Sequence, residues 1–145
     1  MQSKLIQERA GERTFALVFD PGEEALAGLK RFAREANLIG AHFTAIGAFS
    51  DVTLGFFDPE ARHYVEIPVR EQVEVLSLIG NVAQFDGKPK VHAHAVVGKR
   101  DGTAHGGHLI AAHVRPTLEV VLVESPHHLR RETDSATGLA RLRTD

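Results

Sequence analysis

The hydrophobic pattern starts with a strand followed by a helix. Residues 14–19 (TFALVF) form an almost continuous apolar and β-branched run, which is typical of a buried strand. Asp20 and Pro21 follow and favour a helix start, because aspartate accepts hydrogen bonds from free backbone N–H groups and proline suits the first helical position. Apolar side chains then recur at helical spacing, at Leu26, Leu29, Phe32, Ala33 and Ala36. The pattern predicts one main helix over about residues 21–36.

Strand patterns dominate the rest of the chain. Apolar or alternating runs predict short strands at residues 4–9, 41–49, 52–57, 64–69, 73–85, 91–97 and 118–124. Residues 108–114 fit either a strand or a short helix. Gly47 inside a strand indicates a bulge or a close backbone approach, and Pro68 indicates an edge or bent strand. We therefore predict an α+β fold with a mainly antiparallel sheet of about seven short strands and one main helix.

Length and composition indicate one globular domain. The chain has 145 residues, of which 43% are hydrophobic and 25% are charged, so most of it should be ordered. We assign residues 1–126 to the domain and residues 127–145 to a polar C-terminal tail that could be flexible, with a turn of helix at residues 136–142. No apolar run reaches the roughly 20 residues that span a bilayer, and the start lacks the apolar stretch of a signal peptide. We expect a cytoplasmic protein with no membrane partner.

Charge and cysteine content exclude several chemistries. The chain has no cysteine, which removes disulfides, thiolate zinc sites, iron–sulfur clusters and cysteine nucleophiles. The formal net charge is −2, whereas proteins that bind nucleic acid over their whole surface usually have a basic excess. The nine histidines are the unusual feature of the composition. The chemistry is therefore expected among them.

Three of these histidines have spacing that suits a metal. His92 and His94 are two apart in a predicted strand, so both project from one face, about 6–7 Å apart. His108 follows two glycines, and a hairpin between residues 91–97 and 108–114 would bring it to the same face. Three histidines with an open position are typical of a catalytic or ligand-accepting metal site. Strand histidines that are exposed or hydrogen-bonded are the structural alternative.

The remaining candidates give weaker signals. His105 could substitute as a ligand or lie in a loop, and His113 is not expected to share the site. Gly98 stands where a cupin would place its metal-binding glutamate, which argues against a cupin. Glu119, at the start of a strand, could be a general base, although isolated strand carboxylates are more often solvated or paired.

Six ordered segments resemble a known family. They are GAFS at 47–50, LGFF at 54–57, EVLSL with GN at 74–81, HAH at 92–94, GGHL at 106–109 and PTLE at 116–119. In order and spacing they resemble the plants-and-prokaryotes-conserved (PPC) domain over residues 5–125. The resemblance implies an α/β-type fold with an antiparallel sheet and a homotrimer. In some prokaryotic members it implies zinc held by three histidines, which correspond here to His92, His94 and His108.

The resemblance also suggests DNA as a partner, with one departure. Plant members carry AT-hook segments that bind A·T-rich DNA, and prokaryotic members are commonly labelled DNA-binding by association. The AT-hook core Arg-Gly-Arg-Pro is absent from this sequence. We expect a homotrimeric domain of unresolved role with a three-histidine zinc site, and DNA association is the alternative. A metal-dependent hydrolase using Glu119, and histidines that merely hold a trimer interface, are further alternatives; whether the protein is an enzyme stays open.

Overall fold

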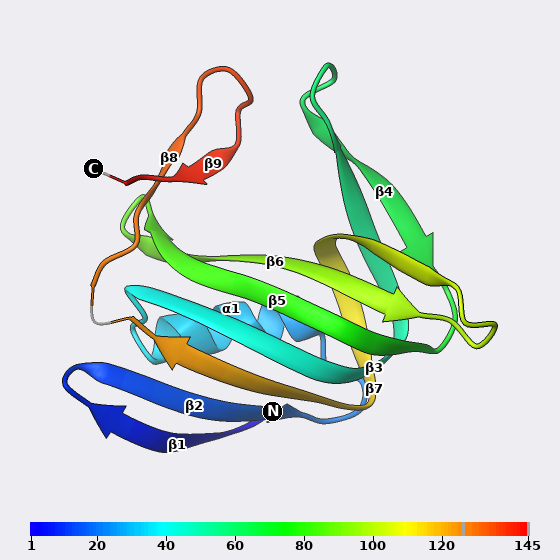
Figure 1. Ribbon diagram of the computed structural model, residues 1–145, viewed down its shortest axis with the longest axis horizontal. Helices are drawn as coiled ribbons and strands as arrows, with labels where there is room; N and C mark the ends of the chain where they lie inside the picture. The colour runs from blue at the N-terminus through cyan, green and yellow to red at the C-terminus, as the bar shows by residue number, and fades with distance from the viewer. Residues whose placement is uncertain (126, 145) are drawn as a thin grey trace.

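Antiparallel strands account for most of the chain in the computed structural model, which describes residues 1–125 and 127–144 (Figure 1). In chain order the elements are β1 (Gln2–Arg9), β2 (Glu12–Phe19), α1 (Ala25–Glu35), β3 (Gly40–Asp58), β4 (His63–Val69), β5 (Val73–Phe85), β6 (Lys88–Gly98), β7 (Ala104–Glu124), β8 (Arg131–Thr133) and β9 (Ala140–Leu142). The predicted sheet and single helix are present. The fold is dominated by its seven-stranded sheet, so the α+β expectation holds in this coarser form.

Helix α1 begins about one turn later than predicted. Glu24, and not Asp20, is the N-cap: its carboxylate accepts hydrogen bonds from the backbone N–H groups of Leu26 (3.1 Å) and Ala27 (2.6 Å). Gly22 has a φ of +86°, a left-handed conformation that does not propagate a right-handed helix. The predicted cap therefore lies in a turn before the helix.

Two strands are much longer than the sequence pattern indicated. The predicted strands 41–49 and 52–57 are parts of one strand, β3, and residues 108–114 and 118–124 both belong to β7. Register shifts on β3 between Gly47 and Phe49 and between Phe49 and Asp51 explain the error. A bulge breaks the alternation of buried and exposed side chains without ending the strand. The local pattern therefore resembles a strand boundary although β3 continues.

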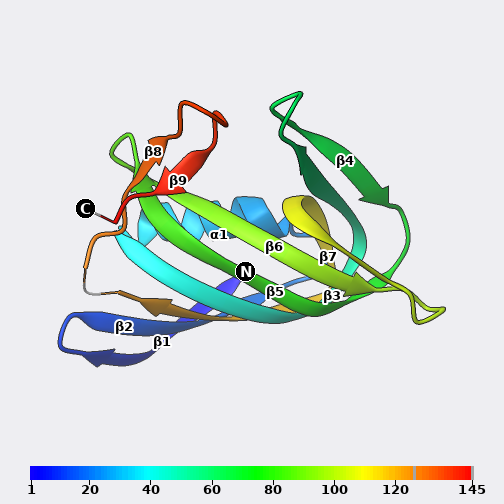
Figure 2. The same cartoon turned by 45° about the horizontal axis from the view of Figure 1, so that its top comes forward.

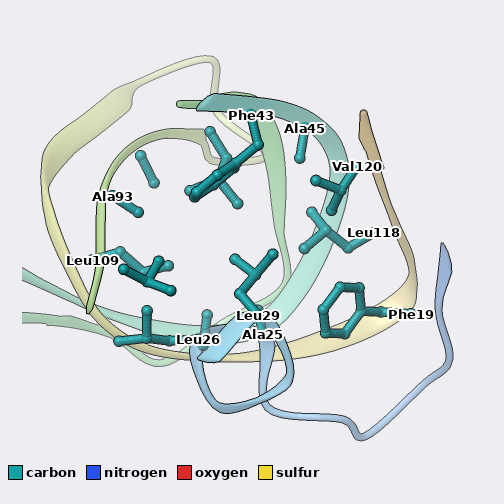
Figure 3. Close-up of a cluster of buried hydrophobic side chains, with 14 of the residues drawn as sticks. Phe19, Ala25, Leu26, Leu29, Phe43, Ala45, Ala93, Leu109, Leu118 and Val120 are labelled. Atoms are coloured by element: carbon teal, nitrogen blue, oxygen red, sulfur yellow. The ribbon is translucent and has the colours of Figure 1, made fainter. Parts of the chain in front are cut away.

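Strand pairing closes part of the sheet into a ring. The sheet order is β1-β2-β7-β6-β5-β3-β4, and β3 also pairs with β7, so β3, β5, β6 and β7 form a closed circuit. The core lies inside this ring, where Phe43, Leu109 and Leu118 gather around the apolar face of α1 (Figure 3). Only the end of β6, from His94 onward, pairs with β7. Along its whole length β6 pairs with β5, and it also lies against α1. β1 and β4 are the edges of the sheet, and β4 is the strand whose Pro68 indicated an edge or bent strand.

The C-terminal tail folds back onto the domain as a hairpin. Leu129 ties it to the sheet, because its carbonyl accepts a hydrogen bond from Gln84 N (2.7 Å) and its N–H donates to Ile39 O (3.1 Å). The predicted helical turn at residues 136–142 is wrong, since Ala140–Leu142 is strand β9 and pairs with β8. Figures 1 and 2 show this hairpin and the β3–β4 hairpin rising on the same side of β6.

Within the described residues, no helix has both the length and the apolar character needed to cross a membrane.

Candidate metal centre

The fold brings the three predicted histidines together. His92 and His94 project from one face of β6, and His94 stands directly opposite His108 in the β6–β7 ladder. One ligand nitrogen from each histidine lies within 4.8 Å of the others. The Nε2 atoms of His92 and His94 are 3.2 Å apart. Three imidazole nitrogens are therefore close enough together to hold one metal ion.

His108 has a buried side-chain nitrogen, Nδ1, without a hydrogen-bond partner among the described residues. Buried polar atoms are nearly always paired. An imidazole nitrogen without a partner, inside a cluster of histidines, is therefore consistent with a site where a bound metal ion supplies the missing partner. Three neutral imidazoles are also a donor set that zinc accepts with an open position. On both counts the residues fit a metal ion.

Two glycines allow His108 to take its place. A Cβ on Gly107 would lie 2.8 Å from the carbonyl oxygen of Gly55, so β7 could not approach β3 this closely with a larger residue. A Cβ on Gly55 would lie 2.9 Å from the ring of Tyr64. Without it, the Tyr64 ring stacks on the His108 ring at 4.5 Å between centroids. The tyrosine thereby limits the orientations open to the imidazole.

The electrostatics favour neutral histidines. Burial lowers the pKa of His108 to about 4, and the positive charges of the neighbouring histidines, Lys30 and Lys90 act in the same direction. Burial also lowers the pKa of His92, helped by Arg131. A neutral imidazole is the form that binds a metal. These two side chains are thus ready to act as ligands near neutral pH.

A pocket of about 920 Å³ opens beside His92 and His108. Its walls come from α1, Tyr64 of β4, the ends of β5, β6 and β7, and the β8–β9 hairpin. Six cationic side chains line it: Lys30, Arg34, Lys88, Lys90, Arg131 and Arg141. Among the described residues, Asp86 is the one carboxylate in the lining. The candidate metal centre therefore borders a strongly basic cavity.

Arg131 is the residue of this pocket that sequence reasoning missed. Its guanidinium donates hydrogen bonds to Asn81 Oδ1 and to Ala140 O (2.7 Å). Asn81 stands opposite His92 in the β5–β6 ladder, so Arg131 reaches the flank of the histidine cluster. The sequence placed Arg131 in a solvated tail. A signal was available: two short runs of strand length flank a turn-forming Asp134 and Gly138.

The other predicted residues lie elsewhere. His113 makes an ion pair with Asp51, with Nδ1 2.9 Å from Oδ1. His105 faces Val97 in the β6–β7 ladder and is outside the cluster. Glu119 is an exposed residue eleven positions along β7 from His108 and does not line the pocket.

Comparison with known proteins identifies the family. The family model for the Plants and Prokaryotes Conserved (PCC) domain matches residues 6–126. The chain belongs to this family. A comparison with curated proteins finds no match. The family resemblance expected from the ordered segments is therefore confirmed.

Several solved structures are similar to this chain over nearly its whole length. A metal-containing protein from Archaeoglobus fulgidus is 34% identical with a TM-score of 0.83, over 98% of this chain and 96% of that chain. A plant- and prokaryote-conserved protein from Pyrococcus horikoshii is 31% identical with a TM-score of 0.84, over 98% and 94%. A candidate DNA-binding protein from Bacteroides thetaiotaomicron is 26% identical with a TM-score of 0.85, over 94% of each chain.

Proposed function

We propose that this PCC-domain protein binds one divalent metal ion per chain through His92, His94 and His108. The observation that carries the proposal is the cluster itself: three ligand nitrogens within 4.8 Å, contributed by two paired strands. The orphaned Nδ1 of His108 supports it. The similarity to a metal-containing protein from Archaeoglobus fulgidus, at 34% identity, supports it as well.

Zinc is the favoured metal, because neutral imidazole suits it and three such ligands leave a position open. Nickel, copper and iron also accept imidazole, so the donor set alone does not select among them. A bound zinc ion would supply Lewis acidity to a ligand that enters the pocket. The chain's own contribution would be to orient the three imidazoles, with Tyr64 stacked on His108.

Metal content is the decisive measurement. Protein purified without a histidine tag would be analysed by elemental mass spectrometry, beside a His92→Ala/His94→Ala variant. We expect about one metal ion per chain in the parent and none in the variant. His113→Ala is the matched control, because His113 pairs with Asp51 outside the cluster and its loss should leave the content unchanged. Metal-free parent protein, even after reconstitution, would contradict the proposal.

The protein is further proposed to assemble as a homotrimer. Apolar side chains are exposed on the outward face of the sheet, including Ile79 (54% exposed), Val96 (41%) and Val121 (48%). Exposed apolar side chains gathered on one face are typical of an interface. Light scattering should give about three times the chain mass of 15.8 kDa. A mass near that of a single chain would refute the trimer.

DNA association is the second candidate. Folding brings Lys88, Lys90 and Arg131 to one pocket, which gives the chain a local basic site despite its net charge of −2. The similarity to a candidate DNA-binding protein from Bacteroides thetaiotaomicron points the same way. Affinity for a duplex should then fall steeply with salt, because phosphate contacts release counterions. Absence of binding at about 50 mM salt would exclude this function.

A further inference from the structure

The basic pocket beside the histidines is not neutralised from within the chain. Of its six cations, Arg141 pairs with Asp134. The salt bridges between described residues include none of the other five and do not include Asp86. The cavity therefore holds several positive charges with few negative charges nearby. An anion that enters the cavity would supply the missing negative charge.

Among the six cations, Arg131 has the environment that most favours a bound anion. Its guanidinium is half-buried, and its two hydrogen bonds go to neutral oxygens, those of Asn81 and Ala140. Its Nε is buried with no partner among the described residues. Withdrawing a charge from water is costly unless an opposite charge accompanies it. A planar guanidinium with unused N–H groups is matched in shape to a carboxylate or a phosphate.

Other cations converge on the same region from different elements. Lys30 reaches it from α1, and Lys90 from the half of β6 that pairs with β5 but not with β7, two residues before His92. Both lysines lower the pKa of His108 through their charge. An anion between Arg131 and these lysines would lie beside the histidine cluster.

The rest of the lining is apolar and the volume suits a small molecule. Leu26, Val91, Leu109 and Leu142 supply apolar walls. A volume of about 920 Å³ is within the range of small-molecule sites. A recessed cavity of this kind accommodates a compact ligand with a carbon skeleton better than the backbone of a duplex.

We propose that this pocket binds a small organic anion, with its carboxylate or phosphate held by Arg131 and Lys90 and its carbon skeleton against Leu26 and Val91. The inference rests on the proposed function in one respect, since a bound metal would add positive charge at the same pocket. The cations themselves belong to the chain and act with or without the metal.

Calorimetric titration of the full chain, metal-free and zinc-loaded, tests the ligand class. The probes are inorganic phosphate, benzoate, and benzamide, which has nearly the same shape as benzoate but no charge. We expect phosphate and benzoate to bind both forms and benzamide to bind at least about tenfold more weakly than benzoate, as the loss of one charge-assisted hydrogen bond predicts. Equal affinity for benzoate and benzamide would overturn the proposal.

Substitutions test the assigned residues. Arg131→Met and Lys90→Met should each lower benzoate affinity about tenfold, whereas Arg131→Lys should retain more of it. Lys90→Met is included because Arg131→Met also removes two internal hydrogen bonds. Arg130→Met is the matched control, since Arg130 is an exposed neighbour that does not line this pocket, and it should leave affinity unchanged. Unchanged benzoate affinity in both Met variants of the pocket would overturn the proposal.

Two further measurements separate this inference from its alternatives. A short DNA duplex is titrated in parallel; binding of the duplex that depends on Arg131, without binding of phosphate or benzoate, would overturn the small-anion assignment. Metal content is measured on the same preparations. Full metal content without anion binding overturns this inference alone, whereas Arg131-dependent anion binding by a chain that takes up no metal overturns the metal proposal alone.

Discussion

Asn81 and Arg131 are fifty residues apart in the chain and are joined by a hydrogen bond from the guanidinium Nη2 to the side-chain Oδ1. This bond ties the C-terminal hairpin to β5 at the position opposite His92. The hairpin therefore becomes a wall of the pocket, because its arginine is anchored beside the histidine cluster.

Loss of this acceptor should destabilise the fold. Asn81→Leu leaves the half-buried Arg131 with one fewer partner, and we expect the free energy of unfolding to fall by about 1–3 kcal/mol. Urea unfolding followed by circular dichroism measures it. The same substitution in an Arg131→Met background should cost less, because the interaction is already absent. Additive effects of the two substitutions would show that the bond contributes nothing.

Removing the proposed metal should lower thermal stability. A ligand that binds only the folded state stabilises it by mass action, by about 2.7 kcal/mol at a free concentration of one hundred times its Kd. The midpoint of thermal unfolding should therefore rise when zinc is added to metal-free protein and fall when a chelator is added. His108→Ala should abolish both shifts. Equal shifts in parent and variant would mean that zinc binds elsewhere.

Gly47 should not tolerate a side chain. It has a φ of +149°, and a Cβ there would meet the backbone of Thr117 and lie 2.8 Å from the Cα of Leu118. We expect Gly47→Ala to cost about 2–5 kcal/mol in unfolding free energy, from backbone strain and overpacking together. The matched control is Gly102→Ala, with a φ of +83° but open space around the Cβ, which should cost about 1–2 kcal/mol. Similar losses of unfolding free energy in the two variants would show that the close approach of the Thr117 backbone to Gly47 does not matter.

The ion pair between His113 and Asp51 should be visible in a titration. The hydrogen bond to Asp51 raises the pKa of His113 above 6.5, and the pair also lowers the pKa of Asp51 below 3.8. The pair thus stabilises the folded state fully between about pH 4 and 6.5, and the His113 contribution is lost as pH rises through its folded-state pKa. Both side chains are about half exposed, so the contribution should be at most about 1 kcal/mol.

Proton NMR of the imidazole measures this shift directly. In Asp51→Asn the pKa of His113 should fall toward 6.5. Glu60→Gln, in the turn between β3 and β4, is the control and should leave the His113 titration unchanged. A His113 pKa that does not respond to Asp51→Asn would contradict the ion pair.

Local patterns were enough to predict the parts of the site that depend on neighbours in sequence. His92 and His94 share a face because strand side chains alternate with a period of two. Gly47 was expected to mark a bulge or a close backbone approach; the register of β3 shifts beside it, and the Thr117 backbone lies against it. Helix α1 starts about one turn after the predicted position, because the side chain of Glu24, and not that of Asp20, accepts hydrogen bonds from the free backbone N–H groups.

Apart from the hairpin between residues 91–97 and 108–114, the long-range pairing of strands was beyond the sequence alone. Bulges in β3 interrupt the alternation, so one strand looked like two. The order of residues shows that the tail is polar, but does not show that Leu129 would join it to Ile39 and Gln84.

By itself, the sequence determined the composition of the strands, the single amphipathic helix, the family and the three histidines that could share a metal. The tertiary structure alone decided that His108 stands opposite His94, and that Arg131 and Lys30 reach the same pocket from opposite ends of the chain. The physical reason is that side-chain periodicity is a local property of the backbone, whereas strand register and the return of a tail are chosen by burial and hydrogen bonding across the whole fold.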